Sequence, residues 1–188
     1  MFEKTKYTVY MNPKSKMSIR FANIPEDLDL IKQLWLDYLT WGNNNMQANY
    51  GVHPHNPVEI VEKDLEQLEI FQAPFGCIIL AICENKICGI GNLSRINGEI
   101  GELKRIYVNP DFRRFGAGRA ILESLLTTAK NVGYKSIRLN TPKFMEAAHA
   151  LYRSVGFCDI EHYAETEIPE SFKDYLLFME LDLADFQK

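Results

Sequence analysis

Hydrophobic residues follow two different periods in the first part of the chain. Residues 18–22 alternate apolar and polar positions, which predicts a strand, and residues 28–38 repeat apolar side chains at helical spacing. The run Gly-Asn-Asn-Asn at 42–45 predicts a break in that helix, so residues 42–57 are expected to be a loop or a broken helix. A second helix is predicted over 58–71, where apolar residues again share one face.

The rest of the chain changes to a meander and then to alternating elements. Strands are predicted over 77–83, 87–94 and 100–108, and Asn97-Gly98 is a strong hairpin signal. The later elements are expected to be a helix over 116–132, a strand over 136–139, a helix over 143–154 and strands over 157–163 and 175–183. This order predicts an α/β fold: a mixed, mostly antiparallel central sheet flanked by helices, with a central βαβ crossover.

Length and composition limit the chain to one folded domain. It has 188 residues, of which 46% are hydrophobic and 24% charged, as in ordinary globular proteins. Residues 1–17 are polar and basic and are interpreted as an N-terminal arm. Residues 18–188 are expected to form the single domain.

Charge and cysteine spacing exclude several classes of function. A net charge of −4 and a pI near 5.6 argue against a nucleic-acid partner. No apolar run is long enough to span a membrane, and the N-terminus lacks the apolar segment of a signal peptide. We therefore expect a cytoplasmic protein without a membrane partner. The four cysteines lack the spacing of zinc ligands, which predicts buried thiols and no metal site.

The segment 102–119 carries the most informative pattern. A predicted strand leads through a short loop into a helix with the pattern Arg-x-x-Gly-x-Gly, at residues 113–118. Free N–H groups at a helix start attract anions, and glycines let a phosphate approach the backbone. Basic side chains also outnumber acidic ones over 101–153. Taken alone, however, the pattern is a weak signal, because a plain strand, turn and helix with solvated arginines also produces it.

This segment resembles motif A of the GNAT superfamily of N-acetyltransferases, whose signature is Arg/Gln-x-x-Gly-x-Gly/Ala after the fourth strand. A second block, 143–157, is similar to the superfamily helix that ends in Leu-Tyr-x-x-x-Gly-Phe. The sequence Glu-Leu-Lys-Arg-Ile-Tyr-Val at 102–108 is similar to that of many small bacterial members. The resemblance covers 99–158 in motif and 18–183 in element order. It implies acetyl-CoA as co-substrate, bound in an opening between the fourth and fifth strands.

The same resemblance implies a set of cofactor-binding residues. Pantetheine would pair with the backbone at 106–108, and backbone amides at 114–119 would hold the pyrophosphate. Many members carry an Asn where this chain has Met145, and Asn140 lies near that position. The implied set is Ile106, Tyr107, Val108, Arg113, Arg114, Phe115, Gly116, Ala117, Gly118, Arg119 and Asn140.

Two residues match positions that carry the chemistry in the family. Glu102 would be the general base, directly or through a water, and Tyr152 would be the general acid for the CoA thiolate. Glu102 could instead form an ion pair with Lys104 or Arg105, with Glu99 or a water chain as the base. Tyr152 could instead be a core tyrosine.

The resemblance implies an acyltransferase that acetylates a primary amine, with a small-molecule or peptide acceptor and a possible homodimer. The alternative is a non-catalytic acetyl-CoA sensor or interaction module. His53 and His55 are expected in a loop near the acceptor, Trp35 in the core, and Trp41 and Tyr50 nearer the pocket. The acidic residues Glu165, Glu167 and Glu170 weakly favour a cationic acceptor.

Overall fold

The computed structural model describes residues 17–113, 115–166 and 168–187. The predicted arm, apart from Met17, therefore lies outside the described residues, and Met17 itself opens the first strand. The strands are β1 (Met17–Phe21), β2 (Cys77–Cys83), β3 (Lys86–Arg95), β4 (Ile100–Val108), β5 (Ser136–Pro142), β6 (Cys158–Ile160) and β7 (Leu176–Asp182). The helices are α1 (Leu28–Tyr50), α2 (Pro57–Glu66), α3 (Ala117–Val132) and α4 (Glu146–Arg153), with short 3₁₀ turns η1 (Leu68–Phe71), η2 (Pro110–Phe112) and η3 (Glu170–Tyr175).

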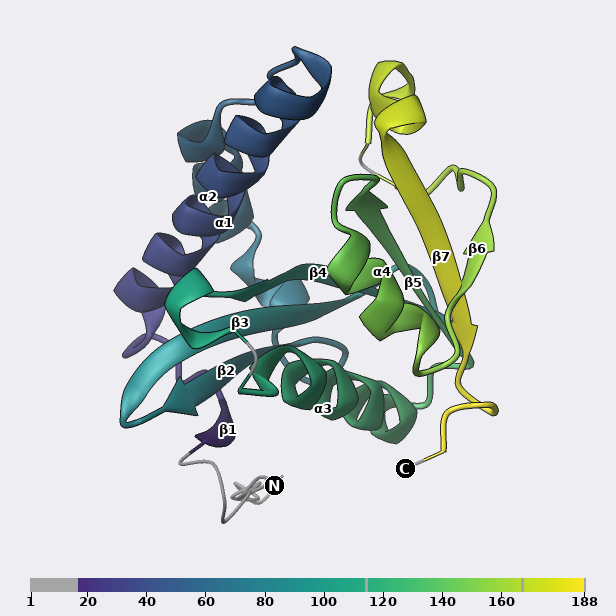
Figure 1. Cartoon of the computed structure of the whole chain (residues 1–188). Helices are drawn as coiled ribbons and strands as arrows, with labels where there is room; N and C mark the ends of the chain where they lie inside the picture. Colours follow the sequence, from purple (N-terminus) through teal and green to yellow (C-terminus); the bar gives the residue numbers. More distant parts are fainter. Residues whose placement is uncertain (1–16, 114, 167, 188) are drawn as a thin grey trace.

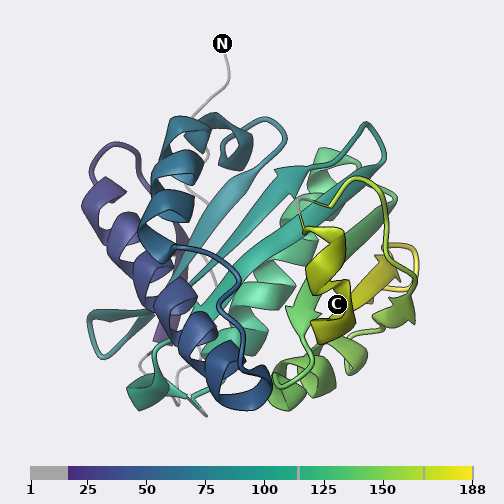
Figure 2. The same ribbon diagram turned by 90° about the horizontal axis from the view of Figure 1, so that it is seen from above.

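The strands form one sheet in the order β1-β2-β3-β4-β5-β7-β6. The β4–β5 pair is parallel and is joined by the crossover through α3, whereas the other pairs are antiparallel. In Figures 1 and 2, α1 and α2 lie over one face of the sheet and α3 lies under the other. The predicted fold class is confirmed.

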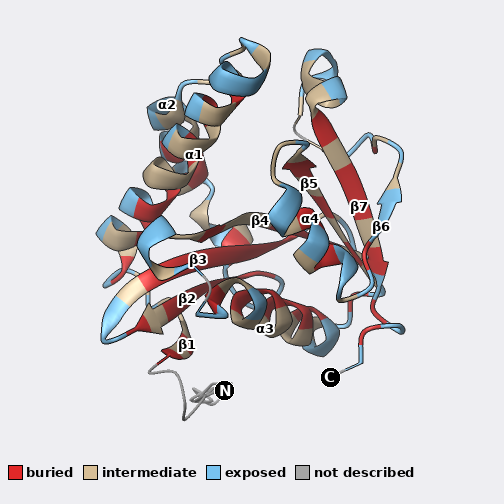
Figure 3. Ribbon diagram, in the orientation of Figure 1, coloured by how far each residue is buried: buried red, intermediate tan, exposed pale blue. Residues whose placement is uncertain are grey.

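The core is divided by the sheet into two apolar layers. In β2, Ile79 packs toward α3, whereas Ile78 and Leu80 pack toward α1 and α2. A strand buried on both faces reads as a continuous apolar run, which is what β2 shows. In Figure 3, buried residues continue along the central strands and the inward faces of the helices.

The predicted break in the first helix is wrong, because α1 runs without interruption from Leu28 to Tyr50. The asparagines find partners inside the helical conformation. Asn45 and Asn49 donate their side-chain amides to the carbonyls four residues before them, at 2.7 and 2.8 Å. Asn43 is buried and donates to the His55 carbonyl at 2.6 Å. The helix instead ends at Gly51, which has a left-handed backbone.

Other predicted helices and strands are longer than those of the structure. The expected helix over 58–71 divides into α2 and the 3₁₀ turn η1, with Gln67 between them. The expected helix over 143–154 begins only at Glu146, and the strand expected over 157–163 is confined to β6. No helix among the described residues has the length and apolarity that crossing a membrane requires.

Gly91 in β3 lies directly against α3. A Cβ atom there would lie 2.5 Å from Ile121 Cγ2 and 2.9 Å from Leu125 Cδ1, and both side chains are fully buried. We expect Gly91→Ala to lower the free energy of unfolding by about 1–3 kcal/mol through overpacking. Urea titration measures this. Gly98→Ala is the control, because its Cβ would meet only Arg95 Nη2 at 3.7 Å. Equal midpoints for the two variants would contradict the packing described here.

Candidate active site

The strands β4 and β5 separate after a short stretch of pairing. Their register covers only Ile100 to Glu102 on β4 and Ser136 to Arg138 on β5, although the strands continue to Val108 and Pro142. Figure 1 shows the two strands diverging toward α1 and η3. Among the described strands, none pairs with this edge of β4 after Glu102. Backbone groups of 103–108 are therefore available to a ligand along that edge.

A bulge in β4 determines which side chains face α1 and α2. The β3–β4 register shifts between Ile90 and Asn92, and Arg105 has a φ of +52°. Such a bulge places two successive residues on one face of a sheet. Lys104 and Arg105 consequently both line the cavity on the α1 side, and Ile106 packs into the layer under α3.

The predicted phosphate loop leads directly into α3. Gly116 is the N-cap, with a φ of +84°, and a Cβ atom there would meet nothing within 4 Å. No side chain among the described residues caps this helix start. Its first N–H groups lie at the positive end of the helix dipole, where anions are stabilised. Arg114 falls outside the described residues.

The neighbouring side chains point in different directions. The Arg113 guanidinium lies 5.1 Å from the centre of the Trp41 ring, which brings the loop next to α1. Phe115 is exposed. Arg119 turns away toward α4 and donates to Ser154 Oγ at 2.7 Å. Among the described residues of the loop, Gly116 thus combines an exposed backbone with open space at the start of α3.

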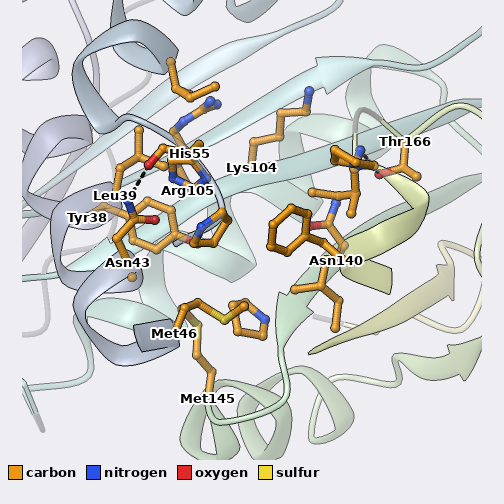
Figure 4. A pocket seen from close by; sticks show the side chains of 18 of the residues that line it. Tyr38, Leu39, Asn43, Met46, His55, Lys104, Arg105, Asn140, Met145 and Thr166 are labelled. Carbon is orange, nitrogen blue, oxygen red and sulfur yellow. Dashed lines mark hydrogen bonds between the residues drawn. The ribbon is translucent and has the colours of Figure 1, made fainter. Parts of the chain in front are cut away.

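A cavity of about 340 Å³ lies between α1 and α2 on one side and the segment that precedes β7 on the other. Its floor is β4 at the point where β4 and β5 separate, and Asn140 of β5 completes it. Figure 4 shows Tyr38, Asn43 and Arg105 on one wall and Asn140 and Thr166 on the other. The size suits a small molecule.

Glu102 lies in this cavity and is 4% exposed. Its Oε1 accepts a hydrogen bond from the Tyr163 hydroxyl at 2.8 Å, and its Oε2 lies 3.3 Å from Lys104 Nζ. The ion pair expected as an alternative is therefore present, and it coexists with a position in the cavity wall. Burial and the Glu102 carboxylate both raise the pKa of Tyr163, so that its hydroxyl remains a donor at neutral pH.

Tyr152 is one of two buried residues of α4 and packs on Phe157, with ring centres 5.8 Å apart. The side chain is 7% exposed and belongs to the layer under α3. Burial raises the pKa of Tyr152, and the nearby Tyr38 raises it further by a smaller amount. Its hydroxyl therefore carries its proton at neutral pH.

The remaining predicted residues are distributed between the cavity and the core. Tyr107 is buried against Tyr38, with ring centres 6.0 Å apart, and Val108 is half-buried. Asn140 and Met145 both line the cavity. Asn140 also contributes a hydrogen bond to Tyr163, so it belongs to the same polar cluster as Glu102.

The aromatic residues expected in or near the pocket lie in the core or in contacts between α1 and later segments. Trp35 is fully buried, as predicted. Trp41 packs on Phe144 from the β5–α4 turn, with ring centres 5.7 Å apart. Tyr50 packs on Tyr175 at 5.1 Å. The last two contacts connect α1 to segments that follow β5 and precede β7.

Two histidines, His53 and His55, are expected in a loop near the acceptor. His55 lines the cavity, whereas His53 is exposed. Burial and the nearby Arg105 lower the pKa of His55, so the imidazole is neutral at pH 7. Within the described ranges, no group of three or more His, Cys, Asp or Glu side chains could hold a metal ion.

Sequence reasoning missed the polar cluster opposite Asn140. Arg105 forms an ion pair with Asp64 of α2, and both side chains are 10% exposed. Its guanidinium also lies 5.5 Å from the Trp35 ring centre. Nothing in the spacing of Asp64 and Arg105 connects them, because the contact joins a helix to a distant strand. Tyr163 was missed for the same reason.

Comparison with known proteins agrees with this architecture. The model of the Acetyltransferase (GNAT) family matches residues 34–157. An uncharacterised N-acetyltransferase of Schizosaccharomyces pombe is 27% identical over 177 residues, which cover 93% of this chain and 99% of that protein. The chain belongs to the GNAT acetyltransferase family, and the predicted acyltransferase class is confirmed.

Solved structures show the same fold at low identity. A GNAT-family acetyltransferase from Staphylococcus aureus Mu50 has a TM-score of 0.65 and 22% identity, covering 89% of this chain and 99% of that chain. Spermidine N-acetyltransferase from Vibrio cholerae, solved with CoA and spermine, has a TM-score of 0.61 and 18% identity. That comparison covers 90% of this chain and 97% of the other.

Proposed function

We propose that this protein transfers the acetyl group of acetyl-CoA to the primary amine of a small-molecule acceptor. The observation that carries the proposal is the separation of β4 and β5 beside a cavity that contains Glu102. A thioester lying along the free edge of β4 would reach this cavity from the side of α3. The spermidine N-acetyltransferase solved with CoA and spermine has the same fold, which supports coenzyme A as the carrier of the acetyl group.

The phosphate groups of the donor fit the start of α3. Positive φ and open space at Gly116 allow close approach of an anion, and the uncapped amides that follow supply donors. Pantetheine would take its hydrogen bonds from the backbone of Ile106, Tyr107 and Val108, on the edge that β5 leaves free. Arg113 would add positive charge beside the loop.

The reaction requires one proton to leave the amine before attack. In the proposed mechanism Glu102 accepts that proton, directly or through a water, and the free nitrogen attacks the thioester carbonyl carbon. The C–N bond forms and the C–S bond breaks. The second amine proton passes to solvent, and Glu102 also returns its proton to solvent. The sulfur leaves as a thiolate and takes a proton from Tyr152, which solvent then restores. The Ile106 amide would stabilise the oxyanion.

Tyr152→Phe tests the proposed acid. We expect a decrease in kcat of about tenfold or more, because the thiolate would leave without a proton donor. The dissociation constant for acetyl-CoA should stay nearly constant, since the ring and its packing on Phe157 remain. Stopped-assay kinetics and calorimetry measure the two quantities. An unchanged kcat would limit Tyr152 to packing.

Transfer itself is tested by incubating the protein with acetyl-CoA and a mixed panel of amines. Mass spectrometry should find an N-acetylated amine, together with an equal amount of free CoA thiol. A protein that binds acetyl-CoA but acetylates no amine in a panel covering amino acids, amino acid amides, polyamines and peptides would favour a sensor instead.

A further inference from the structure

The charged residues of the cavity wall are mostly cations. Lys63, Lys104 and Arg105 line it, whereas Glu102 is the one carboxylate among the described lining residues. Glu102 already faces Lys104 at 3.3 Å. An acceptor rich in ammonium groups would therefore meet no unpaired carboxylate in the part of the wall that the structure describes, which disfavours a polycation.

The acidic loop does not change this balance. Glu165 pairs with Arg138 at 3.4 Å, and Glu170 pairs with Lys173. Neither glutamate lines the cavity, and the residues of this segment that do so, such as Thr166 and Phe172, are uncharged. Glu167 lies outside the described residues. The weak expectation of a cationic acceptor therefore finds no support in the positions of Glu165 and Glu170.

The wall formed by α1 and β4 also has unused hydrogen-bonding capacity. Arg105 Nε and His55 Nε2 are buried and have no partner among the described residues. The guanidinium presents five N–H donors, and its ion pair with Asp64 is made through Nη2. Lys63, on the same side, has no ion pair with a described residue and is exposed at the cavity rim. Arg105 Nε is always a donor, and a buried donor without an acceptor is costly, so an anionic ligand would satisfy it.

From this arrangement we infer that the acceptor carries a carboxylate as well as its amine, as an α-amino acid does, with the carboxylate held by Arg105 and Lys63. The inference rests on the proposed function, since it names the acceptor of that same site. It assigns Arg105, held over Trp35 and against Asp64, as a specificity-determining residue. The amine would then face Glu102, which precedes Arg105 on β4 and lies in the stretch that pairs with β5.

Matched substrate pairs test the carboxylate directly. The panel consists of α-amino acids, their C-terminal amides, the corresponding decarboxylated amines, and putrescine and spermidine. We expect kcat/KM for the best amino acid to exceed that for its own amide by about 10- to 100-fold, the usual value of a charged hydrogen bond in a buried site. An amide or a polyamine that is acetylated as well as the best amino acid would overturn the inference.

Variants connect the preference to the residues. Arg105→Lys keeps a charge but loses Nε, and Lys63→Gln removes a cation from an exposed position, so the fold should tolerate both. Each should lower kcat/KM for the amino acid several-fold more than for its amide, so that the preference for the acid decreases. Lys173→Gln is the control, because it removes a cation outside the cavity. The inference is wrong if acid and amide fall together in both variants.

A binding measurement separates this inference from the proposed function. The protein is saturated with CoA and titrated with each amino acid and its amide. Tighter binding of the acids than of the amides supports the carboxylate site, whether or not turnover is seen. If turnover is absent, that result counts against the transfer reaction alone. Turnover of neutral amines with no preference in binding supports transfer and refutes the carboxylate site.

Discussion

Replacing Gly116 by Glu is expected to abolish binding of acetyl-CoA. Gly116 lies at the start of α3 with a φ of +84°, and its missing Cβ faces open space. A glutamate there would place a side chain and a negative charge where the pyrophosphate is proposed to lie. Repulsion between like charges costs several kcal/mol, so affinity should fall by at least about 100-fold. Calorimetric titration with acetyl-CoA measures the change.

Gly133→Glu is the matched control for this variant. Gly133 ends α3 with a φ of +97°, and its Cβ would also meet nothing within 4 Å. The two substitutions therefore impose similar backbone strain at opposite ends of one helix. Both should lower thermal stability, and only the change at Gly116 should remove binding. Equal affinity in the two variants would disprove the phosphate site at the start of α3.

Replacing Glu102 by Gln is expected to lower kcat by about 10²- to 10⁴-fold, the contribution usual for a positioned general base. Glutamine has nearly the same shape and can still accept the hydrogen bond from Tyr163. The dissociation constant for acetyl-CoA should change little, because Glu102 lies before the proposed pantetheine edge. Steady-state kinetics over a range of pH measures the effect. The decrease in kcat at low pH, which reports protonation of the general base, should disappear.

Glu99→Gln separates the two candidate bases. Glu99 immediately precedes β4 and forms an ion pair with Lys135 at the surface. It does not line the cavity, so its replacement should leave kcat nearly unchanged. If Glu102→Gln reduces stability but not kcat, the Glu102–Lys104 pair has a structural role only. A loss of activity on replacing Glu99 would instead transfer the proposed role to that residue.

The parts of the fold that the sequence predicted correctly depend on local signals. The apolar run of β2, the Asn97-Gly98 turn and Gly133 at the end of α3 each act within a few residues. The predicted break at 42–45 failed for a physical reason. Asparagine has a low intrinsic helix propensity. Here, however, the side-chain amides of Asn43, Asn45 and Asn49 donate hydrogen bonds to carbonyls within or beside α1.

The site shows the same division between local and distant information. The phosphate loop is contiguous, so its residues could be named from the sequence by resemblance to a known motif. The Arg105–Asp64 pair and the Tyr163–Glu102 hydrogen bond join segments far apart in the chain. The bulge that places Lys104 and Arg105 on one face has its positive φ at Arg105, a residue type that does not indicate such a backbone. Acceptor chemistry, which depends on these contacts, therefore becomes visible only in the folded chain.

The proposed function requires acetyl-CoA to bind in the opening between β4 and β5. Calorimetric titration of the protein with acetyl-CoA, with NAD and ATP as comparison ligands, tests this most directly. We expect saturable binding of acetyl-CoA at one site per chain and no comparable binding of the other two nucleotides. Absence of binding, or equal binding of all three, would contradict it.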